Sequence, residues 1–426
     1  MLAHGAILRQ PVFGSARGQQ PTTRRIDDDA RMMIGSTVTR RRRAIVHVMG
    51  WHSQQFGSFE RMLVELARRC ADSGLESHFV FQSRPRSQQF IDEAPATFHV
   101  VPTALGPVDP RFMSRLARVV RPLGPSHLHA HHGVDLYNAL TVARVLGVPH
   151  RFATKHSTPG GSRITLAHAR HRWIARQVET YFTVSHWVER NLIEAGIPAA
   201  KLRVCYLGVN IDRYSPDPTA RTSVRKELGL APNRRIVLST SHLRPGKGVE
   251  LLPSLAAALR EDPGEVTVLV AGDGPLRESL TQRARSLGLT DGDLRLLGVR
   301  ADIPRLLAAA DAFAFPTTGR EGMPLGALEA LATGTPVVAT RVSDLGELIA
   351  DVALLVEPGD EQALVAACRR LLREPHLAQQ LGVSGRELAR ARLSVGDAAE
   401  SYAKVYLQPS PSDTRADHRP RARPKQ

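Results

Sequence analysis

The sequence predicts an α/β protein with two doubly wound, Rossmann-like parallel-sheet domains. Short apolar runs such as Ala44–Met49 alternate with helical patterns such as Phe59–Ser73. This alternation is typical of right-handed βαβ units that build a parallel sheet. The alternating series occurs twice, and the length of 426 residues agrees with two or three domains of about 150 residues each.

The first series lies in the N-terminal half of the chain. Its helix Phe59–Ser73 is amphipathic and is expected to end at Gly74, since glycine readily adopts the left-handed conformation that follows many helices. The strands of this half are expected at five apolar runs: residues 44–49, 77–82, 127–131, 150–153 and 181–184.

The second series lies in the C-terminal half. Helices are expected at Val249–Leu259 and at Leu325–Ala332, the latter ending at Gly334. Strands are expected at residues 235–240, 266–271, 294–297, 312–315 and 336–339. The predicted organisation is a disordered basic arm (1–43), an N-terminal domain (44–210), a linker (211–231), a C-terminal domain (232–385), a C-terminal helix region (386–407) and a disordered basic tail (408–426).

The net charge of +16 is concentrated at the two ends of the chain. Residues 1–43 carry nine Arg and three Asp, and residues 408–426 carry four Arg, one Lys and two Asp. An anionic membrane surface attracts such segments by roughly 1 kcal/mol per Lys or Arg, so it is a candidate partner, with a solvated arm of no function as the alternative. Specific nucleic-acid binding is not expected, because the basic ends lack interleaved aromatic residues that stack on bases.

Three observations predict a cytoplasmic protein, with a peripheral position on the inner face of the plasma membrane as a candidate. The cysteines Cys70, Cys205 and Cys368 are far apart and odd in number, which argues against a disulfide framework and a zinc site. No run of 18 apolar residues is present. The first residues lack the apolar core of a secretory signal.

The most informative segment runs from Glu321 to Glu329 after an expected strand. Pro324 sits where a helix start tolerates proline, and the backbone N–H groups of the first turn would point at an anion. If the segment is helical, its two carboxylates are about 12 Å apart at 1.5 Å per residue. Hydrolase carboxylate pairs are roughly 5–9.5 Å apart, so these two better suit opposite ends of one long ligand.

Two glycine-containing loops predict that this ligand carries phosphate. The cations Arg244 and Lys247 follow strand 235–240 and precede an expected helix. Cations beside a helix N-terminus form a diphosphate site that needs no metal. The loop after strand 266–271 contains Gly272 and Gly274, whose small size permits the close approach of a ligand.

In their order along the chain, Lys247, the Gly272–Pro275 loop, Glu321 and Glu329 resemble the retaining glycosyltransferases of family 4. The likeness covers roughly residues 44–407. It implies the GT-B fold, in which two Rossmann-like domains face each other across a cleft. It also implies that Glu321 faces the donor sugar, that Glu329 binds the ribose of the nucleotide and that Lys247 contacts the diphosphate.

One position departs from the family. The family usually has an Arg five residues before the Lys, where this chain has His242. Either His242 donates a hydrogen bond to the phosphates, or Arg244 reaches them. The resemblance also assigns the loop after Glu321 to the donor site, with the residues Gly322, Met323, Pro324 and Leu325.

The first domain carries further signs of the same resemblance. Residues 57–61 are similar to a family loop that approaches the diphosphate, which implies a place for Gly57 in the donor site. An ordinary helix start capped by Ser58 is the alternative. His156 follows a strand in a Thr-x-His pattern, and the resemblance places it near the donor sugar and the acceptor hydroxyl.

Histidines cluster at the end of strand 127–131. Three histidines as close as His129, His131 and His132 suggest a metal site, but no carboxylate or cysteine motif accompanies them, so no metal is expected. His131 and Trp51 are instead expected on the acceptor side, where Trp51 would stack on a sugar; a tryptophan packed in the core is the alternative.

Two other patterns are better explained by structure than by function. Asp291 and Asp293 match the Asp-x-Asp of metal-dependent glycosyltransferases but lie in a glycine-containing turn. The segments 109–120 and 169–178 are basic and amphipathic, as are helices that lie on membranes. Helices that cover the first sheet explain the same pattern.

The sequence thus predicts a metal-independent hexosyltransferase, with retention implied by the resemblance. The cosubstrate would be a UDP- or GDP-linked sugar, without a cofactor, and the acceptor a cell-surface polysaccharide or a lipid-linked glycan. Glu321, His156 and Lys247 would act on the reacting groups. Two alternatives remain open: a nucleotide-sugar epimerase of the same fold, and a degenerate nucleotide-sugar-binding subunit of a polysaccharide assembly complex, which His242 would explain.

Overall fold

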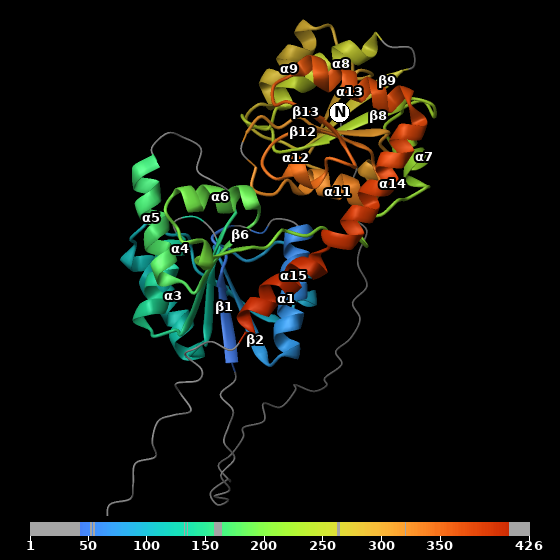
Figure 1. Ribbon diagram of the computed structural model, residues 1–426. Coiled ribbons are helices and arrows are strands. Elements are labelled where there is room, and N and C mark those ends of the chain that lie inside the picture. The colour runs from blue at the N-terminus through green and yellow to red at the C-terminus, as the bar shows by residue number, and fades with distance from the viewer. Residues whose placement is uncertain are drawn as a thin grey trace, which may run out of the picture. The chain divides into compact units, whose positions relative to one another are not determined.

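A computed structural model describes residues 43–51, 53, 56–131, 133, 135–156, 164–261, 265–319 and 321–408, without the side chains of 164–168. The expected arm up to Arg42, the tail from Pro409, and His132 lie outside the described residues. Strands β1–β7 with their helices are called the N-terminal lobe, and β8–β13 with theirs the C-terminal lobe (Figure 1).

The N-terminal lobe contains a seven-stranded parallel sheet in the order β3-β2-β1-β4-β5-β6-β7. All five expected strands are present, and the edge strands β3 and β7 were not predicted. The strands are β1 Arg43–Val48, β2 Leu75–Phe81, β3 Ala96–Val100, β4 His127–Ala130, β5 His150–Lys155, β6 Thr180–Thr183 and β7 Leu202–Val204. The helices are α1 Ser58–Asp72, α2 Gln88–Glu93, α3 Pro110–Leu123, α4 Asp135–Val145, α5 Ile164–Gln177, α6 His186–Glu194 and the 3₁₀ turn η1 Ala199–Lys201.

The C-terminal lobe repeats this design with six parallel strands in the order β10-β9-β8-β11-β12-β13. The strands are β8 Arg235–Thr240, β9 Val266–Ala271, β10 Leu294–Gly298, β11 Ala312–Phe315, β12 Val337–Thr340 and β13 Leu354–Val356. The helices are α7 Ala220–Glu227, η2 Val249–Leu251, α8 Leu252–Arg260, α9 Arg277–Ser286, α10 Ile303–Ala309, α11 Leu325–Thr333, α12 Leu345–Leu348, α13 Glu361–Arg373 and α14 Pro375–Arg392. The last helix, α15 Val395–Tyr406, packs on the N-terminal lobe. The two doubly wound parallel sheets confirm the predicted fold class.

The strand order of each sheet reverses at one point, between β1 and β4 and between β8 and β11. The connections leaving the two strands at such a point run to opposite sides, which opens a crevice at the carboxyl ends of the strands. Trp51 and His131 follow β1 and β4, and Ser241 and Thr317 follow β8 and β11. The topology therefore brings the segments that the sequence singled out to the two crevices.

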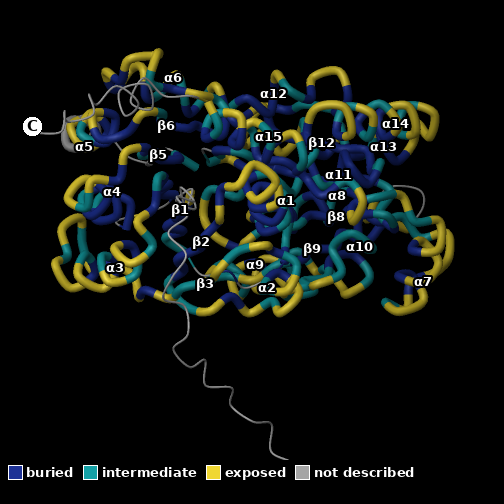
Figure 2. Tube along the Cα trace, turned by 90° about the horizontal axis from the view of Figure 1, so that it is seen from below, coloured by how far each residue is buried: buried dark blue, intermediate teal, exposed yellow. Residues whose placement is uncertain are grey.

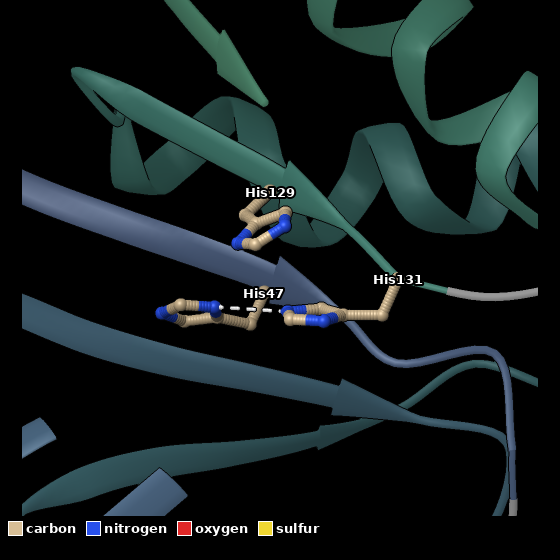
Figure 3. A group of neighbouring side chains, drawn as sticks. All are labelled: His47, His129 and His131. Atoms are coloured by element: carbon tan, nitrogen blue, oxygen red, sulfur yellow. Dashed lines mark hydrogen bonds between the residues drawn. The ribbon is translucent and has the colours of Figure 1, made fainter. Parts of the chain in front are cut away.

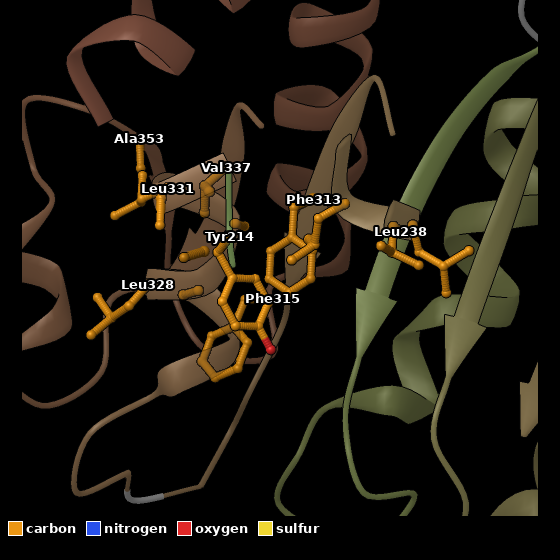
Figure 4. Close-up of a cluster of buried hydrophobic side chains, with 14 of the residues drawn as sticks. Tyr214, Leu238, Phe313, Phe315, Leu328, Leu331, Val337 and Ala353 are labelled. Atoms are coloured by element: carbon orange, nitrogen blue, oxygen red, sulfur yellow. The ribbon is translucent and has the colours of Figure 1, made fainter. Parts of the chain in front are cut away.

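Apolar side chains on both faces of each sheet hold the lobes together. One core of the C-terminal lobe packs Phe313, Phe315 and Leu238 against Leu328 and Leu331 of α11 (Figure 4). Buried positions follow the strands, whereas exposed positions lie on the outer sides of helices and in loops (Figure 2). Both faces of a parallel sheet must be covered, which explains the near-continuous apolar strands.

The expected linker 211–231 is more structured than predicted. It contains α7, whose Arg225 is buried and donates to Asp311 Oδ2 at 2.7 Å, to the carbonyl of Ala309 at 2.9 Å and to that of Arg234 at 3.0 Å. Asp311 in turn accepts from the backbone N–H of Ile236 in β8. The segment is therefore anchored to the second sheet, a role that its charged composition did not indicate.

The chain crosses between the lobes twice at one place. Leu207 and Val395 belong to a core of the N-terminal lobe, whereas Val209 and Leu393 belong to a core of the C-terminal lobe. Val209 N donates to the carbonyl of Leu393 at 2.7 Å, so the two crossings lie against each other. The expected boundary at 385/386 falls inside α14; the chain instead passes to the N-terminal lobe at Leu393, and α15 packs beside α1 (Figure 1).

Candidate active site

A cavity of about 500 Å³ lies at the carboxyl ends of β8 and β9. Its walls include four of the residues assigned by sequence to the donor site: His242, Gly272, Gly274 and Glu329. Val299 and Arg300, which follow β10, complete one side, and Val299 is 64% exposed. The structure thus gathers loops that are up to 90 residues apart in sequence around a space of ligand size.

Glycines are required at the walls of this cavity. Gly272 and Gly274 have φ angles of +143° and +157°. A Cβ at Gly272 would lie 1.8 Å from the carbonyl oxygen of Ser241, and one at Gly274 would lie 2.7 Å from His242 Nδ1. His242 therefore borders the cavity, whereas the structure gives the exposed Arg244 no place in its wall.

Glu329 on α11 receives a hydrogen bond from the other lobe. Ser58 Oγ, at the start of α1, donates to Glu329 Oε1 at 2.9 Å. Tyr214 is a second hydrogen-bonding neighbour, and Arg213 adds a positive charge nearby. Burial raises the pKa of Glu329 to about 7, although Ser58, Tyr214 and Arg213 each act to lower it. The carboxylate is thus held by groups from both lobes.

Glu321 forms an ion pair within the C-terminal lobe. Lys247 Nζ donates to Glu321 Oε1 at 2.6 Å, and the Thr317 hydroxyl lies 3.0 Å from the same oxygen. Gly248 allows the loop to approach β11, because a Cβ there would lie 1.7 Å from the carbonyl oxygen of Pro316. The pairing brings the residues expected at the sugar and at the diphosphate into direct contact.

The segment before α11 touches the N-terminal lobe. A Cβ at Gly322 would lie 1.8 Å from the carbonyl oxygen of His156, so only glycine fits here. Met323 and Leu325 pack against cores of both lobes. Pro324 occupies the N-cap of α11 and Gly334 ends the helix with φ +79°, as predicted. His156 and the loop after Glu321 are therefore neighbours.

Aromatic rings line the crevice side of the N-terminal lobe. The rings of Phe59 and His156 are 5.6 Å apart, those of His131 and His156 are 5.9 Å apart, and those of Trp51 and His131 are 6.4 Å apart. Trp51 also packs on Phe59 with a separation of 4.6 Å between ring centroids. The expected acceptor-side residues therefore form one continuous group with His156.

Behind this group lies a buried cluster of histidines that includes a residue the sequence analysis missed. His47 Nδ1 is 3.3 Å from His131 Nε2 (Figure 3). His129 lies between the hydroxyls of Thr154, at 2.7 Å, and Tyr406, at 2.5 Å. Burial lowers the pKa of His47 to about 3 and holds that of His129 well below its usual value. No sequence motif links His47 to the others; only the pairing of β1 with β4 does.

The three histidines could in principle bind a metal, because ligating nitrogens of His47, His129 and His131 all lie within 4.8 Å of one another. Burial favours the neutral form of His47 and His129, which metal binding needs, because it lowers the pKa of both. Four of the six nitrogens of the three histidines, however, already interact with one another or with two hydroxyls, whereas His47 Nε2 is buried without a hydrogen-bond partner. The absence of a metal site stays a prediction.

The start of α1 differs from the capping alternative. Gly57, not Ser58, is the N-cap, and its backbone N–H donates to Glu60 Oε2 at 3.1 Å. The Ser53 hydroxyl donates to the other oxygen of Glu60 at 2.9 Å. Because Glu60 accepts the hydrogen bond of the N-cap residue at the start of α1, the Ser58 hydroxyl is available to Glu329.

A further contact between the lobes was not foreseen. Asp344, buried after β12, accepts hydrogen bonds from the backbone N–H of His186 and, at 3.3 Å, from Arg190 on α6. Ser343 beside it has φ +46°, which is uncommon outside glycine. The backbone of His186 thus has a structural role, because it joins α6 to the segment after β12.

The Asp-x-Asp pattern and the basic amphipathic segment 109–120 have the structural roles that were expected of them. Asp293 Oδ2 accepts from the backbone and hydroxyl of Thr290, at 2.8 and 2.9 Å, within a turn. Phe112, Leu116 and Val120 of α3 are buried in the core of the N-terminal lobe. Among the described helices, none has the length and apolar character needed to cross a bilayer.

Comparison with known proteins agrees with this geometry. Residues 59–213 match the family described as Glycosyltransferase Family 4, and residues 234–374 match Glycosyl transferases group 1. A GDP-mannose-dependent alpha-(1-6)-phosphatidylinositol monomannoside mannosyltransferase of Mycolicibacterium smegmatis is 30% identical over 298 residues, which are 68% of this chain and 78% of the relative. The alpha-D-kanosaminyltransferase of Streptomyces kanamyceticus is 26% identical over 68% of this chain and 79% of the relative.

Solved structures share the fold. HepE from Anabaena, in complex with UDP and glucose, has a TM-score of 0.74 and 21% identity, over 85% of this chain and 99% of HepE. WaaG, a glycosyltransferase involved in lipopolysaccharide biosynthesis, has a TM-score of 0.66 and 16% identity, over 85% of this chain and all of WaaG. With the family matches, these similarities confirm the GT-B fold, and the chain belongs to glycosyltransferase family 4 and is a glycosyltransferase.

Proposed function

We propose that this glycosyltransferase moves a hexose from a nucleoside diphosphate sugar to a hydroxyl of a lipid-linked or polysaccharide acceptor, with retention at the anomeric carbon and without a metal. The observation that carries the proposal is the cavity bordered by His242, Gly272, Gly274 and Glu329. It offers a carboxylate for ribose hydroxyls and glycines that admit a bulky ligand. The reaction would release the nucleoside diphosphate.

Lys247 and Glu321 would act on either side of the bond that breaks between the sugar and the diphosphate. Lys247 carries the positive charge that a leaving diphosphate needs, and such electrostatic stabilisation is commonly the largest catalytic term. Glu321 would accept hydrogen bonds from the sugar hydroxyls and orient the sugar. His242, which borders the cavity, would donate a further hydrogen bond to the phosphates.

The acceptor would approach from the N-terminal lobe. Trp51 and Phe59, which are partly exposed, would offer ring surface on which a sugar can stack, and the buried His131 would support the ring of Trp51. His156 lies next to Gly322, and so close to the segment that carries Glu321. We assign His156 to the positioning of the donor sugar and the attacking hydroxyl.

The relatives decide which donors to test first. The mannosyltransferase relatives from Mycolicibacterium smegmatis and Mycobacterium tuberculosis are named as GDP-mannose-dependent and are 30% identical to this chain. GDP-mannose is therefore the first candidate. UDP-glucose is the second, because HepE, a neighbour in fold, was solved with it.

The test supplies the full-length protein with GDP-mannose or UDP-glucose and a bacterial glycolipid extract, in EDTA, and measures the nucleoside diphosphate released. Release that depends on the extract, with an NMR-determined product of the donor's anomeric configuration, is the expected result. Turnover of the donor alone to an isomeric sugar would instead identify an epimerase. An inverted product would refute retention, and activity lost in EDTA but restored by Mg²⁺ or Mn²⁺ would refute metal independence.

An anionic membrane surface is the partner we propose for the basic face of α3. Arg111, Arg115 and Arg118 are exposed on this helix, whereas its apolar side is used in the core of the N-terminal lobe. Attraction would therefore be electrostatic and screened by salt. Co-sedimentation with phosphatidylglycerol vesicles but not with phosphatidylcholine vesicles, lost at high salt, is expected; equal binding to both would contradict this.

A further inference from the structure

We propose that Lys155 binds a phosphate group of the acceptor at the edge of the N-terminal sheet, next to His156. The inference rests on the proposed transfer to a lipid-linked acceptor, and it narrows that acceptor to a lipid with a phosphate headgroup. It assigns a binding role to a cation that the proposed reaction leaves unused.

Lys155 is a cation for which the chain supplies no counter-ion. It is the last residue of β5 and is only partly exposed. Within the described part of the chain, its ammonium group has no hydrogen bond and no ion pair. Burial lowers the pKa of Lys155 to about 8, without a contribution from a neighbouring carboxylate. Charges that leave water are normally paired, so this ammonium group is suited to an anion that a ligand brings.

The side chain of Lys155 lies on the face of the sheet that is turned away from α1. Side chains alternate between the two faces along a strand. Phe152 belongs to a core that includes α1 and α15, whereas Ala153, and with it Lys155, lies on the face covered by α3, α4 and α5. The contact of Ser58 with Glu329, at the wall of the donor cavity, is made by α1. An anion at Lys155 therefore fits the acceptor better than the diphosphate of the donor.

Lys155 is also close to the groups that would react. Its neighbour His156 is the residue that we assign to the attacking hydroxyl. A Cβ at Gly322 would lie 1.8 Å from the carbonyl oxygen of His156, so the segment that begins with Glu321 passes beside the end of β5. A phosphate held by Lys155 would thus anchor the acceptor at the end of the strand where its hydroxyl must meet the donor sugar.

The helices on this face carry a large excess of positive charge. α3, α4 and α5 together contain eight arginines and one acidic residue, Asp135. Asp135 is buried and accepts hydrogen bonds from Thr103 and from the backbone N–H of Ala104. On the other face, α1 has three arginines and three acidic residues, and α15 has one lysine and two acidic residues. This asymmetry favours an anionic lipid on the side where Lys155 lies.

The experiment compares the full-length wild type with Lys155→Met, which keeps the length of the side chain and removes its charge. A bacterial glycolipid extract is separated by anion exchange into a neutral and an acidic fraction. Nucleotide release from GDP-mannose or UDP-glucose is then measured against the concentration of each fraction. The acidic fraction is expected to support the reaction, and Lys155→Met should need about tenfold more of it for half-maximal rate, as the loss of one charge-assisted hydrogen bond predicts.

Two further variants serve as controls. Lys155→Arg keeps the charge and should need less than about threefold more of the acidic fraction than the wild type. Lys226→Met, at an exposed position of α7 in the other lobe, should match the wild type. The affinity of all variants for GDP and UDP, measured by calorimetry, is expected to equal that of the wild type.

Two measurements separate phosphate binding from other roles of the charge. Glycerol phosphate, a free headgroup analogue, should inhibit the wild type in competition with the acceptor and should inhibit Lys155→Met more weakly. Lys155→Met should also unfold at an equal or higher urea concentration than the wild type, because the charge that it removes has no partner in the described chain. Lower stability of this variant, or equal inhibition of both proteins, would contradict the proposed role.

The remaining results that overturn the inference differ in what else they affect. If the neutral fraction supports the wild type, or if Lys155→Met needs no more of the acidic fraction, Lys155 binds no acceptor phosphate, while the proposed function stands. If Lys155→Met loses affinity for GDP and UDP, the lysine serves the donor instead. If neither fraction supports release by the wild type, the proposed transfer is wrong and the inference falls with it.

Discussion

The two lobes share a sheet topology but differ in where their polar residues lie. The N-terminal sheet carries five histidines that are all at least 95% buried: His47, His78, His127, His129 and His150. In the C-terminal lobe the groups of the candidate site, such as His242 and Lys247, lie in loops at the ends of strands. Polar groups in loops can face a ligand, whereas those inside the sheet bond mainly to one another.

The buried histidines of the N-terminal sheet stabilise their lobe together with the last helix of the chain. Tyr406, at the end of α15, contacts His129 through its hydroxyl and His127 through its carbonyl. The C-terminal helix thus completes the polar interior of the N-terminal sheet. The C-terminal lobe has a mainly apolar interior, and its buried charged residues among the described residues are Arg225, Asp293 and Asp344.

The largest effect is expected at Glu321. Glu321→Gln keeps the shape of the side chain but removes the charge paired with Lys247. Turnover should fall by about 10³-fold, because removal of one transition-state contact costs 10²–10³, while the KM for the donor changes less than threefold. Steady-state rates of nucleotide release measure both constants. Weaker donor binding with turnover intact would reverse the assigned roles.

Loss of Arg225 should produce the largest change in stability. Arg225→Ala removes the guanidinium that binds Asp311 and the carbonyl groups of Arg234, Arg221 and Ala309, and breaking such a pair costs about 3 kcal/mol or more. Arg221→Ala is the control, since Arg221 pairs with the same carboxylate but has a side chain that is 47% exposed; it should cost less than about 1 kcal/mol. Urea unfolding measures both. Equal costs would contradict the anchoring role of α7.

Glu329 should control binding rather than turnover. Glu329→Ala is expected to weaken nucleotide binding about 30-fold, because a hydrogen bond to a charged group is worth about 2 kcal/mol. The rate at saturating donor should change less than threefold. Calorimetry and kinetics give the two values. Negligible effects of both Glu321 and Glu329 variants would disprove the donor site.

Acid should destabilise the N-terminal lobe through its buried histidines. Burial lowers the pKa of His47 to about 3 and that of His127 to about 4 in the folded protein. The unfolded chain takes up protons near pH 6.5, so stability is full above that pH and decreases as the pH falls toward these lower values. Each such histidine contributes a slope of about 1.4 kcal/mol per pH unit.

The histidine variants test this dependence by unfolding measurements between pH 7 and 5. His47→Phe should reduce the slope of unfolding free energy against pH by about 1.4 kcal/mol per pH unit. His376→Gln, at an exposed position of α14, should leave the slope unchanged. An unaltered slope in His47→Phe would show that His47 does not govern the acid response.

Much of the second lobe could be predicted from sequence, because its signals are local. Gly272, Gly274, Lys247 and the Glu321–Glu329 spacing each lie within one loop or helix, and the cavity gathers several of them. The contacts made by Ser58 could not be predicted, since its partner is 271 positions away. His47 was missed for the same reason: it meets His131 only because β1 pairs with β4.

The expected linker shows a second reason why sequence alone does not predict the structure. Residues 211–231 contain proline and charged residues that are typical of a connection between domains, yet Arg225 is fully enclosed. From composition alone an arginine is expected in solvent, whereas this side chain donates to a carboxylate and to three carbonyl groups in the fold. Such satisfaction of a buried charge depends on tertiary partners that no local pattern reveals.

The most direct test of the account is a titration of the wild-type protein with GDP and with UDP in EDTA. One of the two is expected to bind with a one-to-one stoichiometry, and chelation of metals is expected to leave the affinity unchanged. Binding of neither nucleotide, or binding that appears only when Mg²⁺ or Mn²⁺ replaces EDTA, would contradict a metal-free nucleoside diphosphate site at the ends of β8 and β9.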